Sequence, residues 1–232
     1  MKNFHILSYS AGKDSTALLL RMHKERMPID HVIFIETGYE HPEIYETIGQ
    51  VEQIIAPLKL SRHTINFEYW LGHHIKTRGK NRGQKGYGWP DFRVRWCTSL
   101  KRDKIKKIIN DISRQKNLIE YHGIAYDEQE RASKNNDGRI IKYPLIDWKM
   151  TTTDNLKYCY DHGIKFGNLY EKRKRVSCWL CPMQSIPELR YMYRFKSDQW
   201  NELRRLDLLS HRKFKPEYSL ADLEKKFDKE IT

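Results

Sequence analysis

The chain has 232 residues, with 43 Lys or Arg against 30 Asp or Glu, a formal net charge of +13 and 39% hydrophobic residues. These figures and a 12% aromatic content exclude a disordered chain, and the longest apolar runs, 17–20 and 32–35, are too short to cross a bilayer. The charge excess predicts an anionic partner without choosing among nucleic acid, nucleotide and membrane surface. No sustained apolar signal follows Met1, so we expect a cytoplasmic protein with no membrane partner. In that compartment the four cysteines are ligands, redox groups or core residues rather than disulfides.

Strands and helices alternate along the first two thirds of the sequence. Strands are expected at 4–8, 31–36, 61–67 and 118–123, and helices at 16–22 and 42–55. Pro42 suits a first helical turn and Pro57 a stop. Alternation of this kind requires parallel crossovers, so we predict an α/β fold with a doubly wound, mostly parallel sheet.

The last third is expected to be mainly helical. Residues 143–148 read as a strand or a turn, and Thr151 to Asp154 are expected to cap the helix that carries 158–160. The tail, 187–227, reads as two helical segments separated near Pro216. We therefore divide the chain into a nucleotide-binding domain, 1–148, with a basic insertion at about 76–99, and a cysteine-containing helical region, 149–232, packed on it.

A short polar turn, 10–15, joins the first strand to the first helix. In an open parallel sheet such a turn presents backbone N–H groups to an anion at a helix N-terminus. Gly12 can adopt positive φ and let a phosphate approach closely, Ser10 and Ser15 supply hydroxyls, and Lys13 supplies a charge. Asp14 is useful beside a phosphate mainly when Mg²⁺ lies between them. The alternative is an ordinary strand-to-helix turn.

The turn matches neither of the two common phosphate-binding fingerprints. Leu7 stands where a Walker loop has its first Gly, and a single glycine excludes the dinucleotide fingerprint. It resembles the PP-loop, S-G-G-x-D-S, of ATP pyrophosphatases and of the phosphoadenosine-phosphosulfate (PAPS) reductase family, with Ala11 in place of the first Gly. Further blocks resemble that family in order from Ser8 to about Met183: 36–43 (ETGYEHPE), 96–101 (WCTSLK), 123–131 (GIAYDEQER), 143–148 (YPLIDW), 169–170 (LY) and 178–183 (CWLCPM).

The resemblance implies a Rossmann-like fold, of the adenine nucleotide alpha-hydrolase type, that binds an adenine nucleotide with Mg²⁺. The nucleotide is ATP, or a sulfonucleotide such as PAPS or APS. Lys13, Asp14 and Arg131 are implied to be catalytic, with Arg131 as a phosphate clamp. The residues implied to hold the nucleotide are Ser8, Ser10, Gly12, Lys13, Asp14, Ser15, Thr37, Gly38 and Gly123.

Two reactions are compatible with the resemblance. The family's reductases attack the sulfonucleotide with a cysteine in a C-terminal E-C-G-x-H motif, and no cysteine follows Cys181 in this sequence. We therefore expect adenylation of an acceptor oxygen by ATP, releasing pyrophosphate, followed by sulfur transfer from a donor protein, as in tRNA thiolases and DNA phosphorothioation sulfurtransferases. The alternatives are a reductase that uses an external thiol, and a nucleic-acid-binding protein with a regulatory nucleotide site.

Three of the four cysteines are candidate metal ligands. Cys178 and Cys181 have the C-x-x-C spacing of metal sites, and Cys97 in the matched W-C-T block is the natural third ligand. The resemblance to iron–sulfur thiolases implies a [4Fe-4S] cluster, while zinc and an unmetallated redox pair remain alternatives. Cys159 matches no family position and is interpreted as a core residue, and His162 as a capping or surface group.

Most of the charge excess lies between residues 76 and 116. This segment has 14 Lys or Arg against three acidic residues, an excess of +11. Its first half mixes cations, glycines and aromatic residues, which is typical of mobile loops that embrace a nucleic-acid backbone. We expect contacts with the phosphates of DNA or tRNA from Arg78, Lys80, Arg82 and Lys85. The second half, 101–107, is equally compatible with a solvated helix face. A further basic run, 172–175, lies just before Cys178, so both charged segments flank proposed metal ligands, which favours a polyanionic substrate brought to the cluster.

Overall fold

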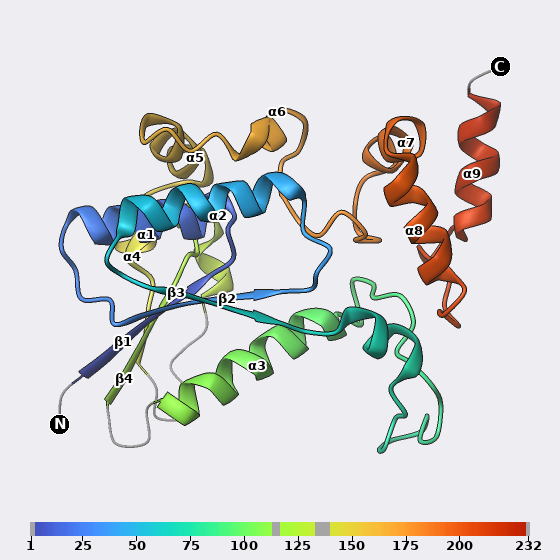
Figure 1. Ribbon diagram of the computed structural model, residues 1–232, viewed down its shortest axis with the longest axis horizontal. Helices are drawn as coiled ribbons and strands as arrows, with labels where there is room; N and C mark the ends of the chain where they lie inside the picture. Colours follow the sequence, from blue (N-terminus) through green and yellow to red (C-terminus); the bar gives the residue numbers. More distant parts are fainter. Residues whose placement is uncertain (1–2, 113–116, 133–139, 231–232) are drawn as a thin grey trace. The chain divides into compact units, whose positions relative to one another are not determined.

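The computed structural model describes residues 3–112, 117–132 and 140–230 (Figure 1). The chain forms two compact units. Unit 1 comprises Met1–Glu36, Glu40–Thr64 and Arg102–Ser177, and unit 2 comprises Thr37–Tyr39, Ile65–Lys101 and Cys178–Thr232. The end of the basic segment, 113–116, lies outside the described residues. The domain division at residues 148 and 149 stays a prediction.

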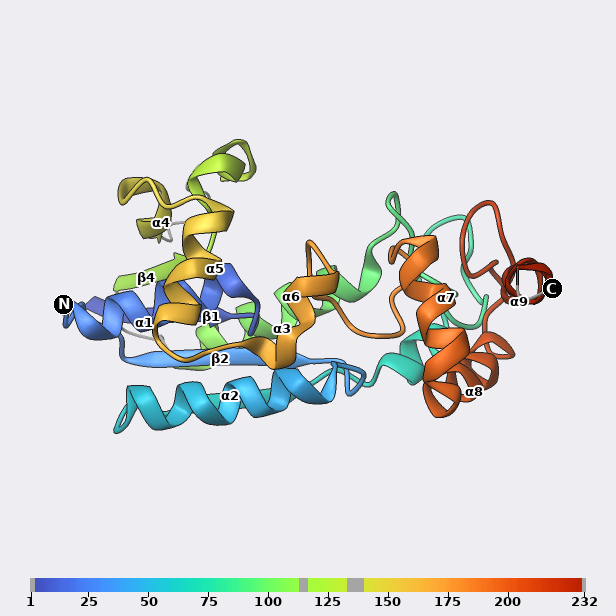
Figure 2. The same ribbon diagram turned by 90° about the horizontal axis from the view of Figure 1, so that it is seen from above.

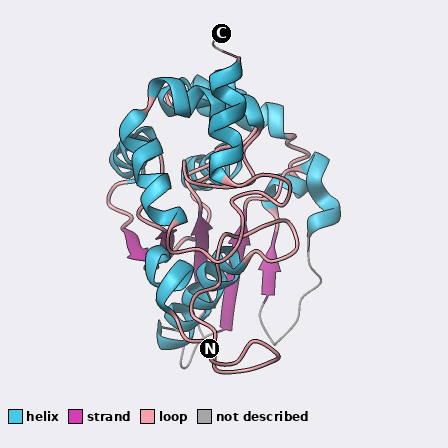
Figure 3. Ribbon diagram, turned by 90° about the vertical axis from the view of Figure 1, so that its right-hand side faces the viewer, coloured by secondary structure: helices cyan, strands magenta, loops and turns pink. Residues whose placement is uncertain are grey.

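Unit 1 is built on a five-stranded parallel sheet, drawn in magenta in Figure 3, in the order β3-β2-β1-β4-β5. The strands are β1 (Asn3–Tyr9), β2 (His31–Glu36), β3 (Leu60–Thr64), β4 (Asn117–His122) and β5 (Ile140–Lys142). The predicted α/β class and four predicted strands are confirmed. Strand β5 was not predicted, because three residues are too few to show a periodic pattern.

The central strands are buried on both faces, as parallel strands between helical layers must be. All four residues from Val32 to Ile35 are buried, which explains their continuous apolar run. Ser8, near the end of β1, is paired with Ile33 on one side and His122 on the other. The carboxyl end of β1 is therefore the central position at that edge of the sheet, where ligands of open α/β sheets bind.

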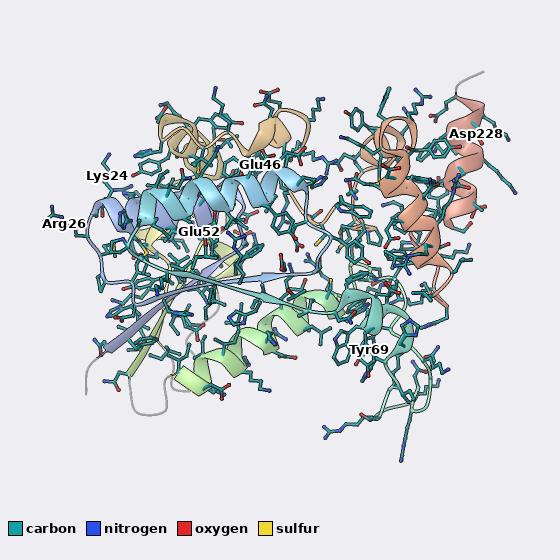
Figure 4. All side chains as sticks on the ribbon, in the orientation of Figure 1. Lys24, Arg26, Glu46, Glu52, Tyr69 and Asp228 are labelled. Carbon is teal, nitrogen blue, oxygen red and sulfur yellow. The ribbon has the colours of Figure 1, made fainter. Side chains whose placement is uncertain are left out.

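Helices cover both faces of the sheet. Helices α1 (Lys13–Lys24), α2 (Pro42–Ile55) and α5 (Thr152–Asp161) pack together, with α1 in contact with both others (Figure 2). In Figure 1 the part of α3 (Trp96–Ile112) in unit 1 lies across the sheet from α1 and α2. The outer face of α2 carries carboxylates, including Glu46 and Glu52, labelled in Figure 4. The helices on two faces confirm the doubly wound prediction.

The segment after β5 confirms one local prediction and corrects another. Thr151 and Asp154 form a capping box, because Asp154 N–H donates to Thr151 Oγ1 (3.2 Å) and Thr151 N–H donates to Asp154 Oδ2 (2.9 Å). His162 is the C-cap residue of α5, as predicted, and its Nδ1 lies 2.8 Å from the carbonyl of Tyr158. Residues 143–148 form no strand, since Pro144 begins a helical turn. The short elements of this region are η2 (Tyr126–Arg131), α4 (Pro144–Asp147), η3 (Phe166–Asn168) and α6 (Leu169–Lys172).

Unit 2 has its own aromatic core, formed around Trp89, Trp200, Phe214 and Phe227. It contains η1 (Tyr69–His73), the first turns of α3, and the helices α7 (Ile186–Phe195), α8 (Ser197–Asp207) and α9 (Leu220–Lys229). The prediction of two helical segments in the tail is wrong, because the chain leaves helical geometry at Lys196 (φ −133°, ψ 59°) and divides the first segment. Among the described helices, none has the length and apolar content that a membrane span requires.

Candidate active site

The turn at the end of β1 reaches α1 through two residues of contrasting geometry. Ala11 is fully buried and has φ +58°, whereas Gly12 has φ −86° and ψ 165°. Gly12 therefore does not use the positive φ that is open to a glycine, and the left-handed residue is Ala11. This is the position where the PP-loop pattern has its first Gly, so Ala11 keeps the loop conformation despite the cost of its Cβ. Gly12 is the N-cap of α1 and provides no capping side chain.

The two loop serines bond to each other. Ser15 Oγ donates to the carbonyl of Gly12 (3.1 Å), and Ser10 Oγ lies 2.9 Å from Ser15 Oγ. The backbone N–H of Ser10 also donates to Ser15 Oγ (3.2 Å). Ser15 is buried, so in this structure its hydroxyl closes the turn, while the more exposed Ser10 hydroxyl lies at the loop surface.

Lys13 and Asp14 carry the charge of the loop. Lys13 Nζ lies 3.7 Å from Asp14 Oδ2, and the two side chains are 11% and 24% exposed. Burial raises the pKa of Asp14, while a hydrogen bond from Asn155 and the charge of Lys13 oppose that rise. A desolvated carboxylate is stabilised by a bound cation, so Asp14 is the residue that would hold Mg²⁺, with the Lys13 ammonium beside its carboxylate.

Three side chains from α5 and α6 form hydrogen bonds with Lys13 and Asp14. Tyr170 Oη accepts the Lys13 N–H (2.9 Å), and Cys159 Sγ donates to the Lys13 carbonyl (3.4 Å). Asn155 Nδ2 donates to Asp14 Oδ1 (2.9 Å). The interpretation of Cys159 as a core residue agrees with its complete burial.

Asn155 and Tyr170 were not predicted to contact the loop. An asparagine inside a helix is unfavourable unless its amide is used, and Asn155 lies one turn from Cys159 on the buried face of α5. That placement was the available signal for Asn155. Tyr170 was visible only as part of the L-Y block.

Gly123 follows β4 and touches the start of α1. A Cβ on Gly123 would lie 2.9 Å from both the N and the Cα of Ser15 and 3.2 Å from the carbonyl carbon of Asp14. The predicted nucleotide residue Gly123 thus lies directly against the loop, and only glycine permits this approach.

Arg131 is at the end of η2, and its side chain is 49% exposed. Its guanidinium is paired with Glu128, so the clamp role predicted for it requires a change of partner. Asp127, the residue before Glu128, accepts hydrogen bonds from the Thr152 backbone N–H (2.8 Å) and hydroxyl (2.7 Å). These bonds connect η2 to the start of α5.

Thr37 and Gly38 follow β2 directly and belong to unit 2. Thr37 Oγ1 accepts the Tyr39 N–H (3.2 Å) and lies 3.1 Å from Cys178 Sγ. Gly38 has φ +83° with open space where a Cβ would lie, so it serves the turn. Their predicted contact with the nucleoside stays a prediction.

The three candidate metal ligands all belong to unit 2. Cys97 is in the first turn of α3, and Cys178 and Cys181 flank a turn closed by the Cys181 N–H bond to the Cys178 carbonyl (3.0 Å). Thiols suit zinc or an iron–sulfur cluster, but over the described residues no three His, Cys, Asp or Glu side chains are grouped to hold a metal ion. We therefore assign no chemical step to a metal at these cysteines, and their role as ligands stays a prediction. Lys215, which was not predicted, donates to the carbonyl of Gln184 (2.8 Å) beside this turn.

The first half of the basic segment is a paired hairpin rather than an irregular loop. Ile75 and Lys85 form an antiparallel bridge, and the Lys76 N–H donates to the Gln84 carbonyl (3.0 Å). Gly86 needs its positive φ and missing Cβ, because a Cβ would lie 2.2 Å from the Leu71 carbonyl oxygen. The predicted nucleic-acid residues are exposed on this hairpin: Arg78, Lys80, Arg82 and Lys85.

Aromatic rings lie at the base of the hairpin. Tyr87 is stacked on Trp70 (centroids 5.9 Å apart) and on Trp96 (5.7 Å). Tyr69, labelled in Figure 4, is 44% exposed beside Trp70. The stacked rings thus fix the base of the hairpin that carries the four exposed cations.

A family model of the phosphoadenosine phosphosulfate reductase domain matches residues 5–184 of the chain. The chain belongs to this family. Phosphoadenosine phosphosulfate reductase domains are nucleotide-binding domains of the PP-loop kind, and residues 10–15 form that loop here.

The individual proteins that resemble this chain do so at low sequence identity. The chain is 26% identical over 209 residues to an uncharacterized protein, MJ0066, from Methanocaldococcus jannaschii, which covers 85% of this chain and 40% of that protein. This chain therefore spans less than half the length of that relative. Among solved structures, it is similar to the U34-tRNA thiolase NcsA from Methanococcus maripaludis with its [4Fe-4S] cluster, at a TM-score of 0.47 and 13% identity, covering 91% of this chain and 74% of the thiolase.

Proposed function

We propose that the protein is an ATP-dependent adenylating enzyme that activates an acceptor oxygen for sulfur transfer. The observation that carries the proposal is the partly buried pair of Lys13 and Asp14 at the N-terminus of α1, in a loop held by the side chains of three other residues. Such a site provides positioning and charge neutralisation, which are the main requirements of phosphoryl and nucleotidyl transfer.

The reaction has two steps. The acceptor oxygen attacks the α-phosphorus of ATP, the bond from that phosphorus to the bridging oxygen breaks, and pyrophosphate leaves with the electron pair. Sulfide-level sulfur supplied by a donor protein then attacks the atom that carries the activated oxygen, which is carbon in a tRNA base or phosphorus in a DNA phosphate. A bond from sulfur to that atom forms, the bond from that atom to the activated oxygen breaks, and AMP leaves with that oxygen and the electron pair. Lys13 neutralises the phosphate charge in the first step, and Mg²⁺ at Asp14 supplies further charge neutralisation when bound.

The cysteine of unit 1, Cys159, contacts the loop but does not support thiol chemistry there. Cys159 belongs to unit 1, and the other three cysteines of the chain belong to unit 2. Burial strongly raises the pKa of the Cys159 thiol, so it remains a neutral, inert side chain.

Sulfonucleotide reduction is the second candidate, because the family is described by that activity. It requires an external dithiol as reductant, with sulfite and the nucleotide as products. Incubation with PAPS or APS and a thioredoxin-type dithiol separates the two: sulfite release supports the reductase, whereas AMP and pyrophosphate formed from ATP with an acceptor support adenylation.

We further propose that the acceptor is DNA or tRNA bound by the basic hairpin. Reversing the charge of Arg78, Lys80, Arg82 and Lys85 together is expected to weaken nucleic-acid binding at least tenfold at 100 mM salt. The slope of log affinity against log salt should fall by about three to four units, because each lost phosphate contact removes about 0.7 to 0.9. The measurement is a filter-binding or anisotropy titration over a range of salt.

A matched control reverses four exposed cations of unit 1: Lys24, Arg26, Lys59 and Lys165. This control changes the net charge equally, so it should leave most of the salt slope intact. Equal effects of the two variants would contradict a specific role of the hairpin and indicate a bulk-charge effect.

A [4Fe-4S] cluster at Cys97, Cys178 and Cys181 is a separate proposal, with zinc as the alternative. The protein purified without oxygen is expected to be brown and to contain iron, and Cys178→Ser should lose both. Cys159→Ala, which changes a cysteine outside the proposed set, should keep the iron. A colourless anaerobic preparation with stoichiometric zinc would refute the cluster, and a preparation without metal would refute both.

A further inference from the structure

Tyr170 places a phenol oxygen inside the phosphate loop. It is the second residue of α6, and its hydroxyl oxygen accepts the backbone N–H of Lys13 at 2.9 Å. A Cβ on Gly12 would lie 3.4 Å from the same oxygen. The hydroxyl therefore lies directly against the turn at Gly12 and Lys13, where α1 begins.

The hydroxyl has a proton that the surrounding protein does not use. A phenol accepts and also donates one hydrogen bond, and no acceptor for the Tyr170 proton is found among the described residues. Burial raises the pKa of Tyr170, so the proton stays on the oxygen at neutral pH. A half-satisfied hydroxyl in such a place is ready to donate to an anion.

The ring explains the packing of Tyr170 but not its hydroxyl. The ring meets Phe166 edge to face, with centroids 5.0 Å apart, and Lys13 Nζ lies 5.3 Å from its centre. A phenylalanine would make both contacts. The contacts of the ring do not require the hydroxyl. The hydroxyl oxygen accepts the first N–H of α1, where the helix dipole favours an anion.

We propose that Tyr170 is a phosphate-binding residue: its oxygen accepts the Lys13 N–H and its proton is donated to a non-bridging phosphate oxygen of the nucleotide. The inference rests on the proposed function, since it assumes a polyphosphate in the loop. In this arrangement the phenol adds one hydrogen-bond donor for phosphate at the positive end of α1. Its ring lies beside the Lys13 ammonium and so keeps that charge close to the same phosphates.

The test is the Tyr170→Phe variant, with Tyr160→Phe as the matched control. Tyr160 is on α5 in the same region and is 38% exposed. Affinities for Mg²⁺-ATP, pyrophosphate and adenosine are measured by titration calorimetry. Tyr170→Phe is expected to weaken ATP and pyrophosphate binding about tenfold, the usual effect of losing a hydrogen bond to a charged group. Adenosine binding should be unchanged, and Tyr160→Phe should match the wild type for all three ligands.

The other outcomes overturn the inference in different ways. ATP and pyrophosphate affinities of Tyr170→Phe within twofold of the wild type assign the hydroxyl a purely structural role. Tighter binding shows that the phenol competes with phosphate for the Lys13 N–H. A wild type that binds pyrophosphate but not ATP contradicts the proposed function while still testing Tyr170, and a wild type that binds neither contradicts both.

Discussion

Gly123→Ala is expected to reduce ATP affinity at least about 100-fold. The added methyl group would lie 2.9 Å from the N and Cα of Ser15, and these backbone atoms cannot move without displacing the first turn of α1. The displaced turn carries Lys13 and Asp14 away from the phosphates, and small errors in position are costly in such sites. Overpacking of this kind also costs about 1–3 kcal/mol of folding free energy. Titration calorimetry and thermal unfolding measure the two effects.

Gly49→Ala is the matched control for this prediction. Gly49 is inside α2, with helical φ and no atom within 4 Å of the added Cβ, so the substitution should leave ATP binding unchanged. It should stabilise unit 1 by about 0.5–1 kcal/mol, the helical preference of Ala over Gly. A Gly123→Ala protein that binds ATP as the wild type does would show that the loop is not held at the described distance from β4.

Asp14→Asn is expected to remove the Mg²⁺ dependence of ATP binding while raising the stability of the nucleotide-free protein at neutral pH. Burial raises the pKa of Asp14 in the folded state, so folding favours the protonated form. The favourable contribution of Asp14 to the free energy of unfolding is therefore present below its unfolded pKa of about 3.9. It is lost as the pH rises through the higher pKa of the folded state. Asn155 can still donate to the new amide oxygen, so the loop geometry should persist.

The measurements are thermal unfolding between pH 3 and 8 and ATP titrations with and without Mg²⁺. The variant should unfold at a higher temperature than the wild type at pH 7 to 8, and the difference should shrink toward pH 3. Asp161→Asn, at a carboxylate that is 54% exposed and paired with Lys157, should change neither property appreciably. An Asp14→Asn protein that is less stable at neutral pH and still binds ATP in an Mg²⁺-dependent manner would contradict the cation role.

Local patterns were enough to predict the sheet and its main helices. The apolar run of β2 and the Pro42 start of α2 fixed elements whose observed bounds, His31–Glu36 and Pro42–Ile55, agree with the sequence reading. These elements are long and regular. β5 has three residues, and the break at Lys196 depends on one residue's backbone angles, so neither left a periodic pattern.

The loop composition was readable from the sequence, but its support was not. Asn155 and Tyr170 lie 141 and 157 residues from their partners Asp14 and Lys13, and only tertiary packing brings them together. Glycine is the residue type that adopts positive φ most easily, but in this loop the positive φ is at Ala11 and not at Gly12. A residue type gives a preference for a conformation, and the surrounding contacts decide where the bend occurs.

The position at which ATP is cleaved tests the central claim most directly. ATP labelled at the α- or the γ-phosphate is incubated with Mg²⁺, the protein, a sulfur donor and total tRNA or genomic DNA, and the products are separated by chromatography. We predict AMP and pyrophosphate, formed only with an acceptor and lost in Lys13→Ala. The appearance of ADP and orthophosphate, with the same dependence on Lys13, would contradict adenylation.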